Sequence, residues 1–166
     1  MSEWGVGVGV GVGVGVDLLT NSTLNSGFDQ RPYFRLLMNL IQDLNLPDFQ
    51  LDGISLQILG VFGSALHVIQ PSVVPGFTFA WLELVSHRMF LPNLLLAKKQ
   101  KGFGLACQLL MDLFAFLSPY LKSGKFGDSI RTLYKGTLRV LLVLLHDFPE
   151  FLCENYLNFV SIVPVS

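Results

Sequence analysis

The chain has 166 residues, of which 51% are hydrophobic and only 14% are charged. Its formal net charge is −1, from 11 basic and 12 acidic residues, so no overall field draws nucleic acid or an anionic membrane toward it. The length suits one domain of about 140 residues once a low-complexity start is set aside. Because the apolar share exceeds the usual range of roughly 45–50%, we expect much of the surface to be covered by other molecules.

The chain begins with a low-complexity segment, in which residues 5–16 are six Gly-Val units. Glycine opposes a stable helix and leaves a strand without side chains to pack. The segment has Glu3 where a signal peptide has basic residues, and its glycine spacing does not fit a dinucleotide-binding fingerprint. Residues 17–29 are small and polar. We therefore predict a disordered tail and linker over 1–28 and a partial helical domain over 29–166.

Apolar residues recur at helical spacing throughout that domain, and prolines separate the segments. The predicted helices run from Pro32 to before Pro47 and then over residues 52–67, 77–91, 103–117 and 129–146. Short connections between successive helices favour antiparallel hairpins. The sequence therefore predicts an all-α fold of HEAT-like antiparallel helical hairpins, which is a fragment of an α-solenoid.

Residues 134–152 read as the end of one helix, a corner and the start of another. Apolar side chains surround the axis from Val140 to Leu145, which predicts that Leu141 and Leu145 are fully buried. Pro149 suits the first turn of a new helix, and Asp147 with Glu150 is a variant of the capping box. Trp81 and the Phe and Leu positions around it are expected in the core, with a peptide-binding groove as the alternative.

The apolar runs are interpreted as buried helices rather than membrane spans. The run from Ile54 to Ile69 is shorter than the roughly 20 residues that a span needs, and it contains several polar or small residues. Asp112 interrupts the apolar run from Leu105 to Leu117.

No pattern of catalytic or metal-binding residues emerges. His67, His87 and His146 lie far apart, and none has a second ligand at helical spacing. We interpret His87 as a helix-surface partner of Glu83 and His146 as a favourable cation at a helix C-terminus. The two cysteines, Cys107 and Cys153, are expected to be buried thiols. We predict no catalytic residues, no metal and no cofactor.

One charged pattern suggests a binding surface. Arg131, Lys135 and Arg139 are spaced four apart, which places them in one basic stripe on the fifth predicted helix, opposite its apolar side. The stripe could bind an acidic segment of a partner, or its members could pair with acids of a neighbouring helix, such as Asp112, or be solvated. Another basic cluster, formed by Lys98, Lys99 and Lys101, is interpreted as a solvated loop.

Several stretches of this sequence resemble a known family: Gln30 to Arg35, Pro75 to Phe77, Phe79 to Arg88, Leu109 to Phe114 and Tyr134 to Leu152. Together they are similar to the C-terminal domain of the Not-one scaffold subunit of the Ccr-Not deadenylase complex. The resemblance implies a non-catalytic helical scaffold that acts in mRNA deadenylation, decay and translational repression. It also implies that the domain docks other Not-type subunits and repressor peptides in the cytoplasm, and in the nucleus as well. Neither direct nucleic-acid binding nor membrane binding is expected.

The sequence departs from the family pattern in two places. Phe103 stands where the family has Trp after Lys-Gly, which conserves an aromatic side chain. Residues 158–166 depart more strongly, and a solenoid that lacks its next repeat is expected to expose apolar surface. Two alternatives to the scaffold remain open, a truncated non-functional gene copy and an unrecognised helical enzyme.

Overall fold

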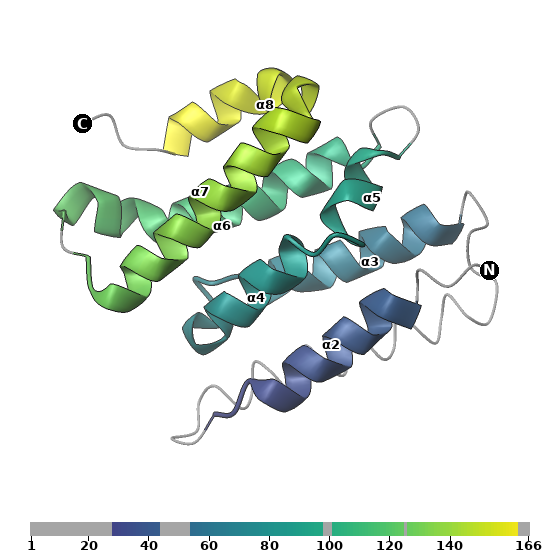
Figure 1. Ribbon diagram of the computed structural model, residues 1–166, viewed down its shortest axis with the longest axis horizontal. Helices are drawn as coiled ribbons and strands as arrows, with labels where there is room; N and C mark the ends of the chain where they lie inside the picture. The colour runs from purple at the N-terminus through teal and green to yellow at the C-terminus, as the bar shows by residue number, and fades with distance from the viewer. Residues whose placement is uncertain (1–27, 44–53, 98–100, 125, 163–166) are drawn as a thin grey trace.

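The computed structural model describes residues 28–43, 54–97, 101–124 and 126–162, and every regular element in those ranges is helical (Figure 1). The elements are α2 (Arg31–Asp43), α3 (Ile54–Val68), the 3₁₀ turn η2 (Pro75–Phe77), α4 (Thr78–Val85), α5 (Leu91–Leu95), α6 (Phe103–Ser123), α7 (Asp128–Asp147) and α8 (Pro149–Ile162). The Gly-Val repeat and the predicted linker lie outside the described residues except for Phe28 and Asp29, so the predicted domain boundary stays a prediction.

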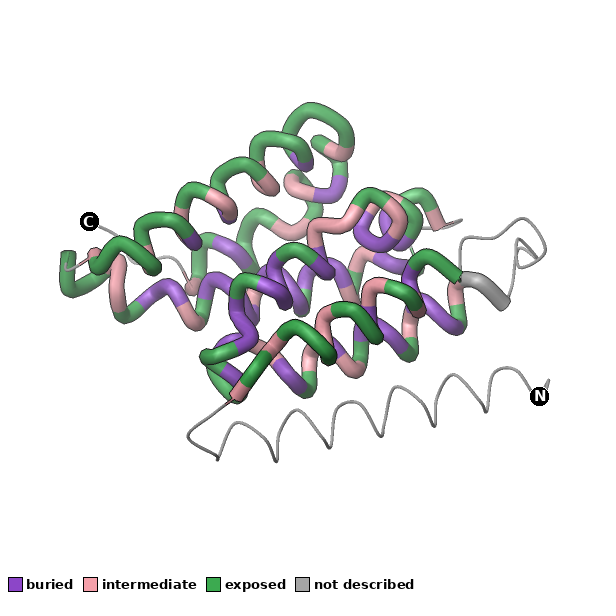
Figure 2. Tube along the Cα trace, turned by 60° about the horizontal axis from the view of Figure 1, so that its bottom comes forward, coloured by how far each residue is buried: buried purple, intermediate pink, exposed green. Residues whose placement is uncertain are grey.

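The helices pack as successive neighbours around α6. This helix contacts α3 and α5 on one side and α7 and α8 on the other, while α2 packs against α4 (Figure 1). The interior of this stack is buried, whereas the outward side of α7 is largely exposed (Figure 2). The all-α, solenoid-like prediction is confirmed for the described part of the chain.

The third predicted helix is in fact two helices. The prediction of one element over 77–91 is wrong, because α4 ends at Val85 and α5 begins at Leu91. The Oγ atom of Ser86 donates a 2.7 Å hydrogen bond to the carbonyl oxygen of Leu82, and the backbone N–H of Ser86 bonds the same oxygen. These bonds end α4, and Pro92 then stands in the first turn of α5, where its missing N–H costs nothing.

Helix α6 continues further than predicted. The sequence predicts an end near Leu117, yet the helix passes through Pro119 and ends at Ser123. The end is set by Gly124, whose φ of 64° is the left-handed conformation that glycine adopts without strain. The backbone N–H of Gly124 donates to the carbonyl oxygen of Tyr120. The end of α6 is therefore set by the capping glycine and not by the proline five residues before it.

The core is built from aromatic and aliphatic side chains of all the central helices. Trp81 is fully buried, as predicted, and its Nε1–H donates a 2.7 Å hydrogen bond to the carbonyl oxygen of Leu66. Phe62 of α3 meets Phe90 edge-on, with ring centroids 5.4 Å apart. The Trp81 bond satisfies the one polar atom of the largest core side chain, which fixes α4 against the end of α3.

The backbone approaches itself closely where α6 begins. A Cβ atom on Gly102 would lie 1.9 Å from the carbonyl oxygen of Leu94, which belongs to α5. Only a residue without a side chain allows this approach. Gly102 therefore permits the tight packing of α5 on the start of α6.

One helix in the described residues, α6, is long and apolar enough to cross a membrane by length and composition, and half of its most apolar window is buried inside the molecule. Its central position among α3, α5, α7 and α8 accounts for that apolar composition.

The prediction that Leu141 and Leu145 of α7 are fully buried is wrong. Leu141 is only partly buried and Leu145 is 60% exposed, whereas Leu144 between them is 2% exposed. Helix α7 is covered by α4, α6 and α8 on one side. The apolar residues on the other side of α7 are therefore not covered by any described helix of this chain.

Candidate interaction surface

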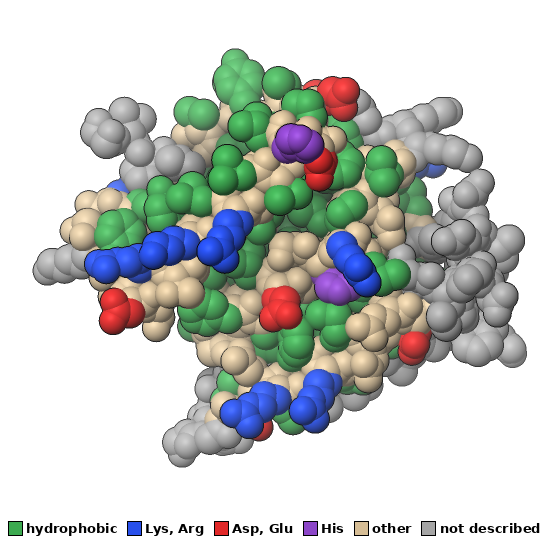
Figure 3. Space-filling view, viewed as in Figure 1, with side chains coloured by type: hydrophobic (Ala, Val, Ile, Leu, Met, Phe, Trp, Pro, Cys, Tyr) green, Lys and Arg blue, Asp and Glu red, His purple; other side chains and the backbone are tan. Residues whose placement is uncertain are grey.

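The predicted basic stripe forms a row on the outer side of α7. Arg131, Lys135 and Arg139 are all exposed, and no described residue forms an ion pair or hydrogen bond with their side chains. The opposite side of the helix carries its buried residues, Leu133, Thr137 and Leu144. Figure 3 shows the row of basic side chains along α7. The stripe does not pair with Asp112, because Asp112 contacts His67 and Gln108 and the basic side of α7 faces away from the core. Solvation and the binding of a partner's acidic segment stay open as roles for the stripe.

Exposed apolar side chains lie next to the basic row on the outer face of α7. Leu138, Leu142 and Leu145 are 40%, 65% and 60% exposed, and hydrophobic side chains adjoin the basic row in Figure 3. The outer face of α7 therefore carries the basic row together with exposed leucines that lie beside it and after it. Such an apolar patch on a helix is typical of a surface that meets another protein.

A groove runs beside the second half of α7. It lies between α7 and the α4–α5 segment and has a volume of about 240 Å³. Its lining is Ser86, Leu91, Pro92, Arg139, Val140, Val143, Leu144 and Phe148. Arg139 is the sole charged side chain of that lining, and it also ends the basic row. The sequence predicted the stripe but not the groove, because the groove walls come from segments about 50 residues apart along the chain.

Helix α8 begins at Pro149, as predicted, and also has an apolar outer side. Phe151 and Phe159 face inward and are buried, and Phe159 packs edge-on against Phe114 of α6. Tyr156, Leu157 and Val160 are each more than half exposed. The expectation that both cysteines are buried is wrong for Cys153, which is exposed on this helix, while Cys107 is buried.

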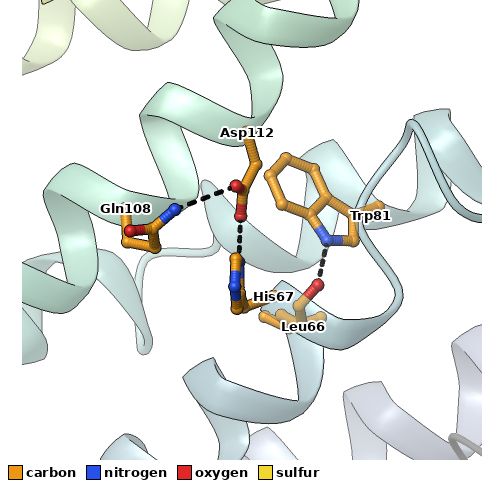
Figure 4. Close-up of polar contacts among 5 residues, drawn as sticks. All are labelled: Leu66, His67, Trp81, Gln108 and Asp112. Carbon is orange, nitrogen blue, oxygen red and sulfur yellow. Dashed lines mark hydrogen bonds and ion pairs between the residues drawn. The ribbon is translucent and has the colours of Figure 1, made fainter.

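The sequence missed a polar cluster between α3 and α6. Nδ1 of His67 lies 2.6 Å from Oδ2 of Asp112, and Nε2 of Gln108 donates a 3.1 Å hydrogen bond to Oδ1 of the same carboxylate (Figure 4). The Asp112 side chain is 6% exposed and that of His67 is 41% exposed. The signal for this cluster was the lone acid in an apolar helix, since a buried carboxylate needs a partner.

The contacts of this cluster tie two helices together. A His–Asp pair becomes a catalytic dyad when the histidine also contacts a nucleophile, and the remaining partner here is an amide that engages the carboxylate. Both carboxylate oxygens of Asp112 are occupied. The arrangement holds α3 to α6 beside the Trp81–Leu66 bond, as Figure 4 shows.

The other candidate residues are spread over the surface. His87 lies in the turn after α4, where its Nδ1 accepts the backbone N–H of Met89 at 3.3 Å, so the expected helical pair with Glu83 is not formed. His146 does lie at the end of α7, with Nδ1 2.6 Å from Oδ1 of Asp147. Within the described ranges there is no group of three metal-ligating side chains. Lys101 is exposed, and Lys98 and Lys99 lie outside the described residues.

Fold and surface together define an all-α helical-repeat domain with an exposed basic and apolar face. Over residues 23–166 the sequence matches the family described as CCR4-Not complex component, Not1. The chain belongs to this family.

Individual relatives agree with that assignment. The chain is 40% identical over 146 residues to the CCR4-NOT transcription complex subunit let-711 of Caenorhabditis elegans, and this match covers 82% of the chain. It is 35% identical over 153 residues to General negative regulator of transcription subunit 1 of Saccharomyces cerevisiae, again with 82% of the chain covered. The chain spans 6% and 7% of the lengths of these two relatives.

Two solved structures resemble the fold. The NOT1 superfamily homology domain from Chaetomium thermophilum matches 98% of the chain and 32% of its own length, with a TM-score of 0.93 and 26% identity. The Not1 C-terminal domain in complex with Not4 matches 95% of the chain and 33% of its own length, with a TM-score of 0.79 and 31% identity. The fold assignment therefore rests on structure as well as on sequence.

Proposed function

We propose that this chain acts as a non-catalytic interaction domain of a CCR4-Not complex. In this role it docks other Not-type subunits and repressor peptides in mRNA deadenylation, decay and translational repression, in the cytoplasm and the nucleus. The observation that carries the proposal is the similar Not1 domain whose solved structure is a complex with Not4. The absence of a catalytic arrangement around His67 and Asp112 in the described residues also favours a binding role over an enzymatic one.

The surface chemistry supports a protein partner. The basic row on α7 is unpaired within the described residues, and exposed leucines adjoin it. Exposed charges at the rim of an interface mainly steer the encounter, whereas buried apolar anchors govern dissociation. The row formed by Arg131, Lys135 and Arg139 is therefore proposed to speed association with an acidic partner more than to set the final affinity.

A direct binding measurement tests this function. The full chain is titrated with a purified Not4-type subunit and with a purified heterodimer of Not-type subunits, and binding is followed by calorimetry. Saturable binding of either partner supports the proposal. The matched control is a longer Not1-type domain that spans the whole solved domain, measured with the same partner preparations. If that domain binds and the folded chain does not, the scaffold function is withdrawn for this chain.

The kinetic role of the basic row is measured separately. Lys135→Glu is compared with wild type by surface plasmon resonance at about 50 mM and about 500 mM salt, because exposed charges act over more than about 10 Å at the lower salt and only over about 4 Å at the higher salt. The association rate should fall at the lower salt and change less at the higher salt. A change confined to the dissociation rate would contradict the steering role.

A further inference from the structure

The basic row and the groove on α7 belong to a single ridge of the helix. Residues four apart on a helix lie in one inclined row, and the row that holds Arg131, Lys135 and Arg139 continues to Val143. Val143 lines the groove and is 54% exposed, and Arg139 lines it as well. A partner that follows this ridge therefore meets three cations and then an apolar hollow.

The hollow suits one large apolar side chain. Its volume is about 240 Å³, and its lining is apolar apart from Ser86 and Arg139. For comparison, a cavity of about 150 Å³ in another protein holds benzene. The hydroxyl of Ser86 is already used, since it donates to the carbonyl oxygen of Leu82. The groove thus offers apolar contact inside and a free guanidinium at its rim.

The shape favours an extended occupant over a helical one. A helix that docks in a groove uses several apolar anchors in a stripe, whereas this groove has room for one. Along α7, Arg139, Lys135 and Arg131 precede Val143 by about 6, 12 and 18 Å at a rise of about 1.5 Å per residue. An extended chain advances about 3.3 Å per residue, so the matching acids lie about two, four and six residues from the anchor.

We propose that this groove is the anchor pocket for an extended acidic segment of a partner protein. One aromatic or large aliphatic side chain of the segment fills the hollow lined by Leu91, Pro92, Val143 and Phe148. Its carboxylates face Arg139, Lys135 and Arg131 in turn. The inference rests on the proposed function, because it names the chemistry of the partner that the interaction domain would hold.

Short synthetic peptides test the pocket independently of any Not-type subunit. The probe is a fluorescein-labelled peptide with aspartates about two, four and six residues from a single phenylalanine, with Ser and Gly elsewhere, made in both chain directions. Binding to the full chain is followed by fluorescence anisotropy. Saturable binding is expected for one direction, with affinity at least about fivefold weaker when the aspartates are changed to asparagine and about tenfold weaker when phenylalanine becomes serine. If neither direction saturates, the proposal is wrong.

Matched variants of the chain locate the binding. Val143→Glu should weaken peptide binding about tenfold at low and high salt, and Arg139→Glu about fivefold at low salt and less at high salt. The controls are Val160→Glu on α8, which is 61% exposed, and Arg35→Glu on α2, which is also exposed. Both should remain within about twofold of wild type, and circular dichroism checks that all four variants fold. Equal losses in the controls would overturn the assignment, as would displacement of the peptide by a short oligoadenylate.

The two proposals fail in different ways. If the chain binds a Not-type subunit with an affinity that Val143→Glu and Arg139→Glu leave unchanged, the function stands and the anchor pocket is wrong. If it binds the acidic peptide at the groove but no Not-type subunit, the pocket stands and the scaffold function is withdrawn.

Discussion

Nδ1 of His67 lies 2.6 Å from Oδ2 of Asp112, and this contact joins α3 to α6 across 45 residues of the chain. His146 and Asp147 form a contact of the same length between neighbouring residues at the end of α7. The two pairs differ in exposure, since the carboxylate of Asp112 is 6% exposed and that of Asp147 is 50% exposed. The chain therefore contains a buried and an exposed version of one interaction.

Removal of the two histidines should have different effects on stability. His67→Ala leaves one oxygen of a buried carboxylate without its partner, and we expect a loss of about 1–3 kcal/mol in the free energy of unfolding. His146→Ala removes an exposed contact and should change stability by less than about 1 kcal/mol. Urea unfolding followed by circular dichroism measures both. Equal effects would show that the His67–Asp112 contact does not stabilise the packing of α3 on α6.

Truncation of an inner and of an outer leucine of α7 should affect stability differently. Leu144 is 2% exposed, and Leu144→Ala is expected to cost on the order of 2–5 kcal/mol because it leaves a cavity. Leu142 is 65% exposed, and Leu142→Ala should stay within about 0.5 kcal/mol of wild type. The midpoint of urea unfolding measures the difference. A large cost for Leu142→Ala would mean that the outer face of α7 is covered in solution.

Glycine substitutions test the close approach of α5 to α6. A Cβ on Gly102 would collide with the backbone carbonyl of Leu94, so Gly102→Ala should cost about 1–3 kcal/mol or more. A Cβ on Gly104, two residues later, would meet no atom of another part of the chain within 4 Å. Gly104→Ala should therefore be neutral or stabilise by up to about 1 kcal/mol, because alanine favours the helix. Thermal unfolding of both variants checks this, and a neutral Gly102→Ala would contradict the tight contact.

The two thiols should react at different rates. Burial raises the pKa of the Cys107 thiol, and a hydrogen bond from Nδ2 of Asn158 to its Sγ lowers it in part. A raised pKa leaves less of the reactive thiolate at a given pH, and burial also blocks the reagent. Cys153 is exposed. Ellman's reagent at about pH 8, near the usual pKa of a free thiol, should therefore modify one thiol quickly and the second only after unfolding.

A serine variant identifies the fast thiol. Cys153→Ser should abolish the fast phase, and Cys107→Ser should leave it intact. A fast phase that survives Cys153→Ser would show that Cys107 is reached in the folded chain.

The helical fold was readable from local patterns because a helix is held by bonds within one short segment. The apolar recurrence at Leu37 and Ile41 and the proline at position 149 predicted elements that the structure confirms. The residues at which helices end were harder to predict from the sequence. The hydroxyl of Ser86 ends α4 inside an apolar run, whereas Pro119 fails to end α6 before Gly124 does.

Burial and pairing were decided by the tertiary structure, because they depend on which segments meet. A spacing of four along the chain was enough to place Arg131, Lys135 and Arg139 on one side of a helix. The family likewise follows from residues scattered over most of the chain. Local sequence patterns did not predict that Leu145 is exposed while Leu144 is buried, nor that His67 contacts Asp112. The groove beside Arg139 likewise exists only because the α4–α5 segment packs against α7, a contact between segments that no local pattern encodes.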